Sequence, residues 1–259
     1  MRSLLTEAPS FHLSICPAGR SGPENMALDQ ALLDAAVRTG GAFLRLYRFE
    51  PACISFGRNE PARHSYDQDA IARRGIDVVR RPTGGRAVWH QHEVTYAVAA
   101  PVTAFGTLRE AYRAIHARLV AALRFLGADV TLAPHRPRPP STALDRLNSC
   151  FAAPVGGEVL IAGRKVIGSA QVRQGGALLQ HGSILLDGSQ AMLRAVSRQP
   201  SAVSGETTLT AALGRRITFE EVTEAIAATW DDTLTLTALD RPRPPSTARF
   251  SDPAWTWRR

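Results

Sequence analysis

The chain has 259 residues, 44% of them hydrophobic, which is enough for one large or two small domains with a sizeable core. No run approaches the roughly 18 consecutive apolar residues of a membrane span, and residues 1–20 lack the apolar stretch of a signal peptide. The three cysteines, Cys16, Cys53 and Cys150, form no CxxC pair, which argues against a disulfide framework or a zinc site built from thiolates. These features predict a cytoplasmic globular protein with no membrane association.

The basic residues are scattered along the chain. The formal charge is +8, but no Lys/Arg-rich cluster or aromatic-basic stacking pattern occurs, so a solvated basic surface is favoured over nucleic-acid binding. An acidic protein partner stays open. Only one of the 31 basic residues is lysine, so 31 − 1 = 30 are arginine. Lysine is a compact charge whose pKa can be tuned, unlike the planar guanidinium, so we take Lys165 as a functional candidate rather than a chance survivor.

Strands and helices are interleaved in the predicted element order. A strand at 11–16 leads to the capping box Ser21-Gly22-Pro23-Glu24, which predicts a helix to about Thr39, closed by Gly40-Gly41, with Leu28, Leu32 and Ala35 on its buried face. The next expected elements are strands at 43–49 and 53–56, a short helix at 64–74, and strands at 76–79, 87–90 and 94–100. Leucines at helical spacing predict a helix at 108–126, followed by three short strands within 158–187 and a helix at 219–230.

This order lacks a strict βαβ repeat and predicts an α/β (α+β) fold, in which helices pack on a mixed β-sheet. We expect a single domain over residues 1–259, with a core at about 11–235 and an irregular C-terminal tail at about 236–259. Proline-rich residues 134–147 indicate an extended surface loop. The octapeptide RPRPPSTA occurs at 136–143 and 241–248, but the flanks differ, so low-complexity drift is favoured over a duplicated domain or a recognition element.

The first candidate site segment is residues 80–90, Arg-Arg-Pro-Thr-Gly-Gly-Arg-Ala-Val-Trp-His. The adjacent glycines Gly84 and Gly85 permit positive φ and close approach of a ligand to the backbone. The flanking Arg81 and Arg86 can orient an anion or a carbonyl group. A hairpin turn gives the same pattern, and the spacing and lysine of a P-loop are absent.

Two further segments hold polar residues within predicted strands. In residues 163–171, strand alternation places Lys165 and Ile167 on one face, with Gly168 opening space beside them. In residues 179–186, His181 precedes Gly182 in an apolar strand. A lone histidine of this kind is more often structural than a base, but the two readings are equally favoured here because His181 lies near the other two motifs.

Cys150 ends the proline-rich stretch in the segment Asn-Ser-Cys-Phe. A free cysteine is usually a small buried hydrophobe, which is how we interpret Cys16 and Cys53. Cys150 instead lies in a polar segment, upstream of Lys165. A thiol of pKa about 8.5 is only a few per cent ionised at pH 7, and a nearby ammonium group would increase that fraction.

Together these segments resemble the biotin/lipoate protein ligase superfamily, and most of all its octanoyltransferase branch that acts on the glycine cleavage system H protein. The resemblance runs from the Asn25-Met26-Ala27-Leu28-Asp29 helix to about Asp187. Residues 81–90 and 163–171 carry the likeness to the superfamily. Residues 171–183 and Cys150-Phe151 narrow it to the branch.

The resemblance implies a mixed sheet flanked by helices in one catalytic domain, with the acyl chain in a tunnel beside the sheet. It implies that Cys150 is a nucleophile that carries the acyl group as a thioester. Lys165 would lower the pKa of Cys150 and hold the acyl carbonyl. The implied substrate-binding residues are Arg81, Gly84, Gly85, Arg86, His90, Gly168, Ser169, His181 and Gly182, with no metal. The donor would be octanoyl-acyl carrier protein and the acceptor a lysine of a lipoyl-domain protein such as the H protein, with no cofactor.

Three alternatives stay open. An ATP-dependent lipoate–protein ligase of the same fold would use ATP and Mg²⁺ to form an acyl-adenylate and would need no cysteine. The short stretch after Asp187 leaves little room for the accessory domain of many such ligases, and Thr83 and Arg86 fit the transferase pattern better. A second transferase branch moves octanoyl from the H protein to other lipoyl domains. A non-catalytic protein that binds lipoyl domains would have no reason to keep both Cys150 and Lys165. The glycines of Val155-Gly156-Gly157 replace a bulkier stretch of the family, which leaves the preferred acyl chain length open.

Overall fold

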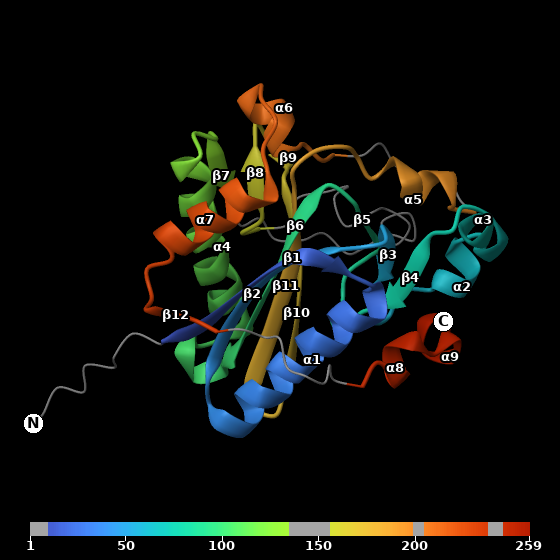
Figure 1. Ribbon diagram of the computed structural model, residues 1–259, viewed down its shortest axis with the longest axis horizontal. Coiled ribbons are helices and arrows are strands. Elements are labelled where there is room, and N and C mark those ends of the chain that lie inside the picture. The colour runs from blue at the N-terminus through green and yellow to red at the C-terminus, as the bar shows by residue number, and fades with distance from the viewer. Residues whose placement is uncertain (1–9, 135–155, 199–204, 238–245) are drawn as a thin grey trace, which may run out of the picture.

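A computed structural model describes residues 10–134, 156–198, 205–237 and 246–259 of the chain. Its centre is a six-stranded sheet in the order β10-β11-β6-β2-β1-β12 (Figure 1). These strands are β1 (Phe11–Arg20), β2 (Ala42–Phe49), β6 (Glu93–Pro101), β10 (Ile167–Gln174), β11 (Ala177–Leu185) and β12 (Leu234–Leu236). Strand β1 pairs in parallel with β2 and β12, and the other neighbours are antiparallel. The sheet is therefore mixed, as predicted.

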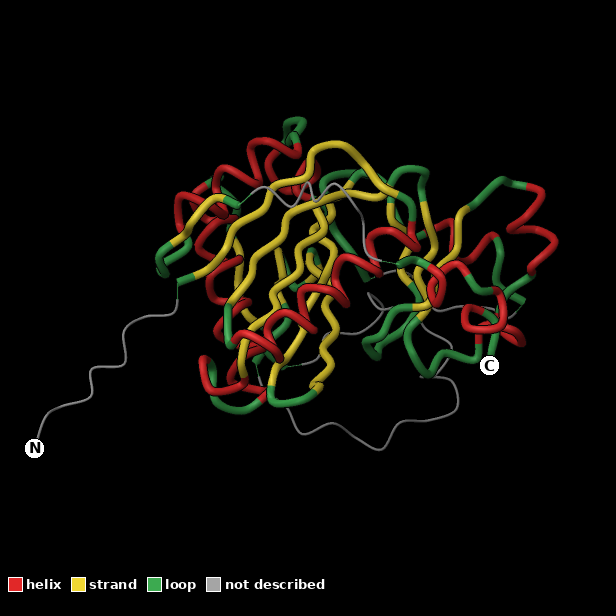
Figure 2. Tube along the Cα trace, turned by 60° about the horizontal axis from the view of Figure 1, so that its bottom comes forward, coloured by secondary structure: helices red, strands yellow, loops and turns green. Residues whose placement is uncertain are grey.

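Helices cover both faces of this sheet. Helix α1 (Gly22–Thr39) lies on one face, and α4 (Leu108–Phe125) and α7 (Phe219–Thr229) lie on the other (Figures 1 and 2). Because successive strand residues point to opposite faces, Tyr96 of β6 belongs to the core under α4 and α7, whereas Ala97 belongs to the core under α1. No helix in the described part of the chain is long and apolar enough to cross a membrane.

The predicted caps of α1 are confirmed. Ser21 and Glu24 form the reciprocal capping box, and Gly40 ends the helix at a φ of 69°. The predicted buried face was only partly right, because Leu32 is buried but Leu28 and Ala35 are half-exposed. The face is rotated so that polar residues on the same helix are also buried, and these contribute to the site described below.

Two three-stranded sheets flank the central one. The first has the order β4-β3-β5 and consists of β4 (Asp77–Arg80), β3 (Cys53–Phe56) and β5 (Val88–His90). The second has the order β7-β8-β9 and consists of β7 (Val130–Leu132), β8 (Val159–Ile161) and β9 (Arg164–Lys165). The remaining elements are α2 (Ala62–Ser65), α3 (Gln68–Arg73), the 3₁₀ turn η1 (Val102–Ala104), α5 (Ala191–Ala195), α6 (Leu209–Leu213), α8 (Ala248–Ser251) and α9 (Pro253–Thr256).

Three further details differ from the sequence prediction. The single short helix expected at 64–74 is two helices, α2 and α3. Residues 158–187 hold four strands rather than three, because the chain turns back both between β8 and β9 and between β10 and β11. The last twenty residues were expected to be irregular, but α8 and α9 form there and pack against α1 and β4. Phe250 anchors them, since its ring is buried in the core under α1. These helices are too short to give a periodic apolar pattern in the sequence.

Candidate active site

A pocket lies on the α1 side of the central sheet, where the sheet meets strands β3 and β5. Its lining comes from residues far apart in the chain: Met26, Tyr47, Phe49, Ser55, Arg81, Val88, His90, Thr95, Gly168, Ser169, Ala170, His181, Gly182 and Ser183. The fold therefore brings together parts of all three site segments singled out in the sequence. Of the substrate-binding residues expected there, Gly84, Gly85 and Arg86 are not part of the lining.

Arg81 holds the glycine loop in place. Its Nη2 donates to the carbonyl oxygens of Gly84 at 3.0 Å and Arg86 at 2.8 Å, and its Nη1 donates to the carbonyl and hydroxyl oxygens of Ser55, both at 2.7 Å. Gly85 has a φ of 84°, the left-handed conformation expected for one of the two glycines. In this structure the Arg81 guanidinium group therefore supports the loop backbone, in addition to bordering the pocket.

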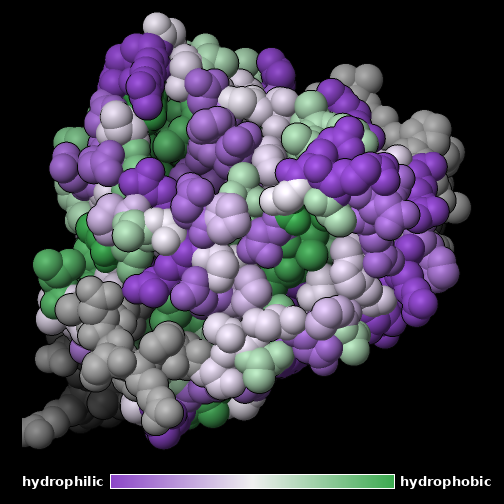
Figure 3. Space-filling model, turned by 45° about the vertical axis from the view of Figure 1, so that its right-hand side comes forward, coloured by the Kyte–Doolittle hydropathy of each residue, from purple (hydrophilic) through white to green (hydrophobic). Residues whose placement is uncertain are grey.

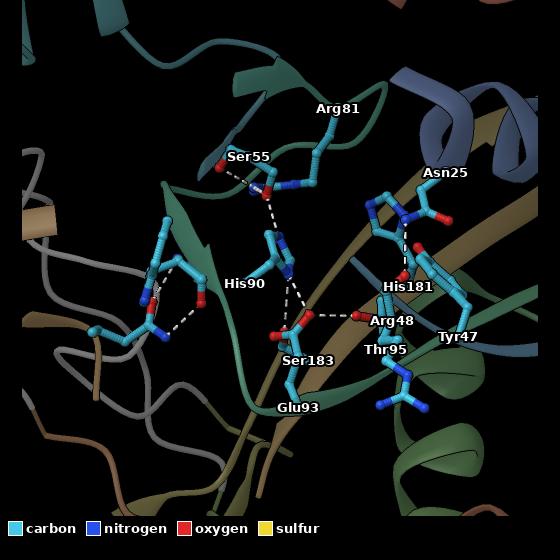
Figure 4. Close-up of polar contacts among 12 residues, drawn as sticks. Asn25, Tyr47, Arg48, Ser55, Arg81, His90, Glu93, Thr95, His181 and Ser183 are labelled. Atoms are coloured by element: carbon cyan, nitrogen blue, oxygen red, sulfur yellow. Dashed lines mark hydrogen bonds and ion pairs between the residues drawn. The ribbon is translucent and has the colours of Figure 1, made fainter. Parts of the chain in front are cut away.

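One end of the pocket is a buried hydrogen-bonded row that ends at a carboxylate (Figure 4). His90 lies 2.6 Å from Ser55 Oγ through Nε2 and 2.6 Å from Glu93 Oε1 through Nδ1. Glu93 also accepts hydrogen bonds from Thr95 and Ser183. The ring of Phe49 stacks on His90 with 4.0 Å between centroids, so the polar row is capped by an apolar surface.

His181 forms a second buried network, directed away from the first and toward α1. Its Nδ1 lies 2.8 Å from Asp29 Oδ2, and its Nε2 lies 2.6 Å from Thr83 Oγ1. Burial lowers the pKa of His181, outweighing the Asp29 hydrogen bond, which raises it. A neutral ring that donates from Nδ1 to Asp29 then accepts from the Thr83 hydroxyl. Helix α1 is thereby linked to the glycine loop through His181.

Asp29 is itself part of a charged cluster with no solvent exposure. Arg45 Nη1 donates to Asp29 Oδ1 at 2.9 Å, Arg45 Nη2 donates to Asn25 Oδ1 at 2.6 Å, and the Tyr47 hydroxyl donates to Asp29 Oδ2 at 2.7 Å. Burial acts to raise the pKa of Asp29, but the His181 hydrogen bond and the Arg45 charge outweigh it and leave the pKa below its usual value. Asp29 is therefore ionised and paired at neutral pH.

The opposite face of the sheet carries a neutral hydrogen-bonded chain. His116 of α4 is fully buried, with Nδ1 at 2.7 Å from the carbonyl oxygen of Gly157 and Nε2 at 2.8 Å from Ser169 Oγ. A carbonyl can only accept, so Nδ1 carries the proton and Nε2 accepts from Ser169. Tyr96 then donates to Ser169 at 2.7 Å and accepts from Gln180 at 2.8 Å. Burial is the main cause that lowers the pKa of His116 to about 4, so its ring is neutral at pH 7.

Gly182 of β11 lies between the two strands, β10 and β6, that carry Ser169 and Tyr96 of this neutral chain. It is paired with Ser169 on one side and Tyr96 on the other. A Cβ atom at Gly182 would lie 2.5 Å from Ser169 Oγ and 2.8 Å from Tyr96 Cε1. The absence of a side chain is therefore what allows the two hydroxyl groups to meet.

Lys165 is buried on the same side as His116 and does not line the pocket. Its Nζ donates to Glu158 Oε1 at 2.5 Å, and its charge contributes to the lowered pKa of His116. Ala133 and Gly157, which flank residues 134–156, are hydrogen-bonded to each other at 2.9 Å. Cys150 and the first copy of the octapeptide lie outside the described residues. Within the described ranges, no group of three or more His, Cys, Asp or Glu residues could hold a metal ion.

Several residues of these networks were not singled out in the sequence. Asp29, the partner of the expected site residue His181, was missed, because the two lie 152 residues apart and no pattern in a single sequence connects them. His116 does carry a local signal: it lies between Ile115 and Leu119, so the periodicity of the helix places it at the edge of the buried stripe. Glu93 had no signal beyond a charged residue at the start of an apolar strand.

The topology is that of a catalytic domain seen in acyl-protein ligases. It superimposes on a lipoate-protein ligase A bound with ATP with a TM-score of 0.74 and 22% identity, over 97% of this chain and 98% of that one. The model of the lipoyl protein ligase A/B catalytic domain matches residues 21–231, and the chain belongs to this family.

Two curated relatives are both named octanoyltransferase LipM. The protein from Geobacillus kaustophilus is 34% identical over 262 residues, covering 91% of this chain and 94% of the relative. The protein from Kyrpidia tusciae is 44% identical over 186 residues, covering 68% of this chain and 66% of the relative. The resemblance seen in the sequence is therefore confirmed at the level of the family. An acyl donor and a lipoyl-domain acceptor are what this family implies in general.

Proposed function

We propose that this chain is an octanoyltransferase of lipoate biosynthesis that takes octanoyl from acyl carrier protein onto Cys150 and passes it to a lysine of the glycine cleavage H protein. The names of the curated relatives support octanoyl transfer. The single structural observation in favour is the pocket that draws its lining from all three site segments.

The pocket presents apolar surface despite its polar residues. Ser55, His90 and Glu93 satisfy one another by hydrogen bonds, and Phe49 stacks over the histidine ring. Such internally paired groups need no partner from the ligand, whereas an unpaired buried polar group would oppose an aliphatic chain. Met26 and Val88 complete an apolar lining for the acyl chain.

The proposed chemistry needs no nucleotide. The Cys150 thiolate attacks the carbonyl carbon of the donor thioester, and the phosphopantetheine thiolate leaves, so one thioester replaces another. The deprotonated amine of the acceptor lysine then attacks the Cys150 thioester, which breaks the C–S bond, forms an amide, and releases the Cys150 thiolate and one proton from the amine nitrogen. The second step makes the overall transfer favourable, because an amide is more stable than a thioester.

Lys165 acts in this proposal as the cation that stabilises the Cys150 thiolate. Its neighbourhood supports the role, because Glu158, which pairs with Lys165, lies on the chain soon after the segment that carries Cys150. His116 donates to the backbone of Gly157 in the same stretch and holds Ser169 through its other nitrogen. Ser169 and Lys165 are thus held by neighbouring buried groups, because Ser169 contacts His116 and Lys165 contacts Glu158, which follows the His116 partner Gly157.

The test is intact-protein mass spectrometry after mixing the protein with octanoyl-acyl carrier protein in the absence of ATP. We expect an octanoyl adduct that hydroxylamine removes and that Cys150→Ala lacks. Lys165→Arg, which keeps the charge but not the shape, should slow adduct formation. Addition of the H protein should discharge the adduct and move the mass to the acceptor.

Three results would contradict the proposal. Octanoylation of the acceptor only when ATP and free octanoate or lipoate are supplied would identify an ATP-dependent ligase in which Cys150 is incidental. Loading of Cys150 from octanoyl-H protein rather than from acyl carrier protein would identify the other transferase branch. Binding of a lipoyl domain with no transfer under either condition would leave a non-catalytic binding protein.

A further inference from the structure

Four exposed arginines gather where the C-terminal helices meet strand β4 and the turn after β3. We call Arg58, Arg249, Arg258 and Arg259 the arginine surface. Arg249 and Arg258 lie over the ring of Trp255, with guanidinium carbons 3.8 and 3.9 Å from its centroid. Figure 3 turns this side of the molecule toward the viewer, and hydrophilic residues cover much of its right-hand part.

The arginine surface is held by buried contacts beneath it. Trp255 Nε1 donates to the carbonyl oxygen of Arg80 at 3.0 Å. The fully buried Arg80 side chain donates to the carbonyl oxygens of Gly57 at 2.7 Å and Thr256 at 2.9 Å, which ties α9 to the turn after β3. Arg258 Nη2 donates to the carbonyl oxygen of Arg58 at 2.5 Å. The guanidinium groups of Arg249 and Arg258 are therefore held in place by their contacts with Trp255 and, for Arg258, with the backbone of Arg58.

The arginine surface has little compensating negative charge within the described residues, where Asp34 is the one carboxylate that acts on Arg249. None of its four arginines forms an ion pair there, whereas Arg118 on the far side pairs with both Asp231 and Asp232. Partial burial lowers the pKa of Arg258, and the charges of Arg259, Arg58 and Arg249 lower it further. These like charges repel one another in the free protein. An anionic partner relieves that repulsion, which makes the free energy of binding more favourable.

The arginine surface adjoins the glycine loop, which Arg81 connects to the pocket. The backbone N–H of Arg58 donates to the carbonyl oxygen of Thr83 at 2.7 Å, at the start of the glycine loop. A Cβ atom at the preceding residue, Gly57, would collide with the carbonyl oxygen of Gly85 at 1.9 Å, so the two backbones are in direct contact. Arg81, which follows the buried Arg80, lines the pocket itself. A partner on the arginine surface would thus lie at the glycine-loop side of the pocket.

We propose that the arginine surface docks the acidic face of the acyl donor, a carrier protein that holds the acyl group on a long phosphopantetheine arm. The inference rests on the proposed function. The long arm lets its carrier dock beside the pocket and still deliver the thioester. An acceptor lysine has a short side chain, so its protein must sit directly over the reacting carbon. Nucleic acid is disfavoured because both faces of Trp255 are occupied by arginines, leaving no platform on which a base can stack.

The test compares two double charge reversals. Arg58→Glu with Arg249→Glu alters the arginine surface, and Arg38→Glu with Arg109→Glu alters exposed arginines at the C-terminus of α1 and the N-terminus of α4. Each pair lowers the formal charge by four, from +8 to +4. Acylation of Cys150 is measured with octanoyl-acyl carrier protein and with octanoyl-N-acetylcysteamine, a small thioester that has no protein surface. Binding of unacylated carrier protein is measured separately. Only these binding measurements use proteins that also carry Cys150→Ala.

The first double variant should raise KM for the carrier-bound donor about ten-fold to a hundred-fold, weaken carrier binding in parallel, and leave acylation by the small thioester unchanged. Its binding should also lose the salt dependence of the wild type. The second double variant should behave like the wild type. Equal effects of the two variants would overturn the inference, and so would a raised KM for the acceptor instead of the donor. Failure of the proposed function would look different, because the wild type itself would then not be acylated by either thioester.

Discussion

The two faces of the central sheet carry buried polar networks of opposite character. Under α1, the Asp29 carboxylate is paired with the Arg45 guanidinium group and with His181, so full charges are buried together. Under α4, His116 and Ser169 are joined by hydrogen bonds between neutral groups. The strand alternation separates the networks, since neighbouring residues of β11 contribute to opposite faces.

This difference indicates a division of labour between the faces. A buried ion pair depends on geometry, because each charge is costly without its partner. The charged network joins α1, β2, β11 and the glycine loop, and so fixes the shape of the pocket. The neutral network lies beside Lys165, where it adds no charge that would compete with Glu158 for the ammonium group.

Breaking the charged network should have the largest effect. Asp29→Asn removes the charge that balances Arg45, and a buried pair broken on one side costs about 3–5 kcal/mol. We expect urea denaturation at pH 7 to show a loss of this size in the free energy of unfolding. The control is Glu220→Gln, because Glu220 faces Arg48 at 3.9 Å on the exposed surface, where a pair contributes about 1 kcal/mol or less. Equal losses for the two variants would mean that Asp29 and Arg45 are not coupled.

The neutral network should contribute to the pH dependence of the free energy of unfolding. The pKa of His116 is about 4 in the folded chain and 6.5 in its ordinary state, so between these values the unfolded chain binds a proton here that the folded chain does not. Stability from this site is therefore present above pH 6.5 and is lost as the pH falls toward 4. The shift corresponds to roughly 3 kcal/mol.

His116→Gln removes this titration. Between pH 7 and pH 4 the free energy of unfolding should fall by roughly 3 kcal/mol less in the variant than in the wild type. A matched variant at the exposed His64, His64→Gln, should keep the wild-type pH dependence. If His116→Gln retained the full pH dependence, the acid sensitivity would belong to other groups, and His116 would not be held neutral.

The next effect tests the close packing around Gly182 in the neutral network. Gly182→Ala places a methyl group 2.5 Å from both the carbonyl oxygen of Gly168 and the Ser169 hydroxyl oxygen, and overpacking of this kind costs about 1–3 kcal/mol. At Gly84 an added Cβ meets no atom within 4 Å, so Gly84→Ala should change thermal stability by less than about 0.5 kcal/mol. Similar melting shifts for both variants would show that crowding at Gly182 is not what requires a glycine.

The sequence predicted the ends of secondary-structure elements better than it predicted the hydrogen-bond partners of buried polar residues. Ser21 and Gly40 marked the ends of α1 because caps act within one turn of a helix. The partners of the site histidines are set by tertiary packing, as in the contact of Asp29 with His181. Lys165 could be singled out from composition alone, but its contact with Glu158 could not.

The smallest effect separates burial from hydrogen bonding as the cause of the neutral state of His116. Tyr96→Phe removes the hydroxyl group that donates to Ser169 and accepts from Gln180, and the loss should be about 1 kcal/mol. Ser169 can still donate to His116 in this variant, and the ring stays buried under α4. Because burial is the main cause of the lowered pKa, Tyr96→Phe should be less stable at every pH yet keep the wild-type slope between pH 7 and pH 4. A slope reduced to that of His116→Gln would instead assign the neutral state to the hydrogen-bonded chain as a whole.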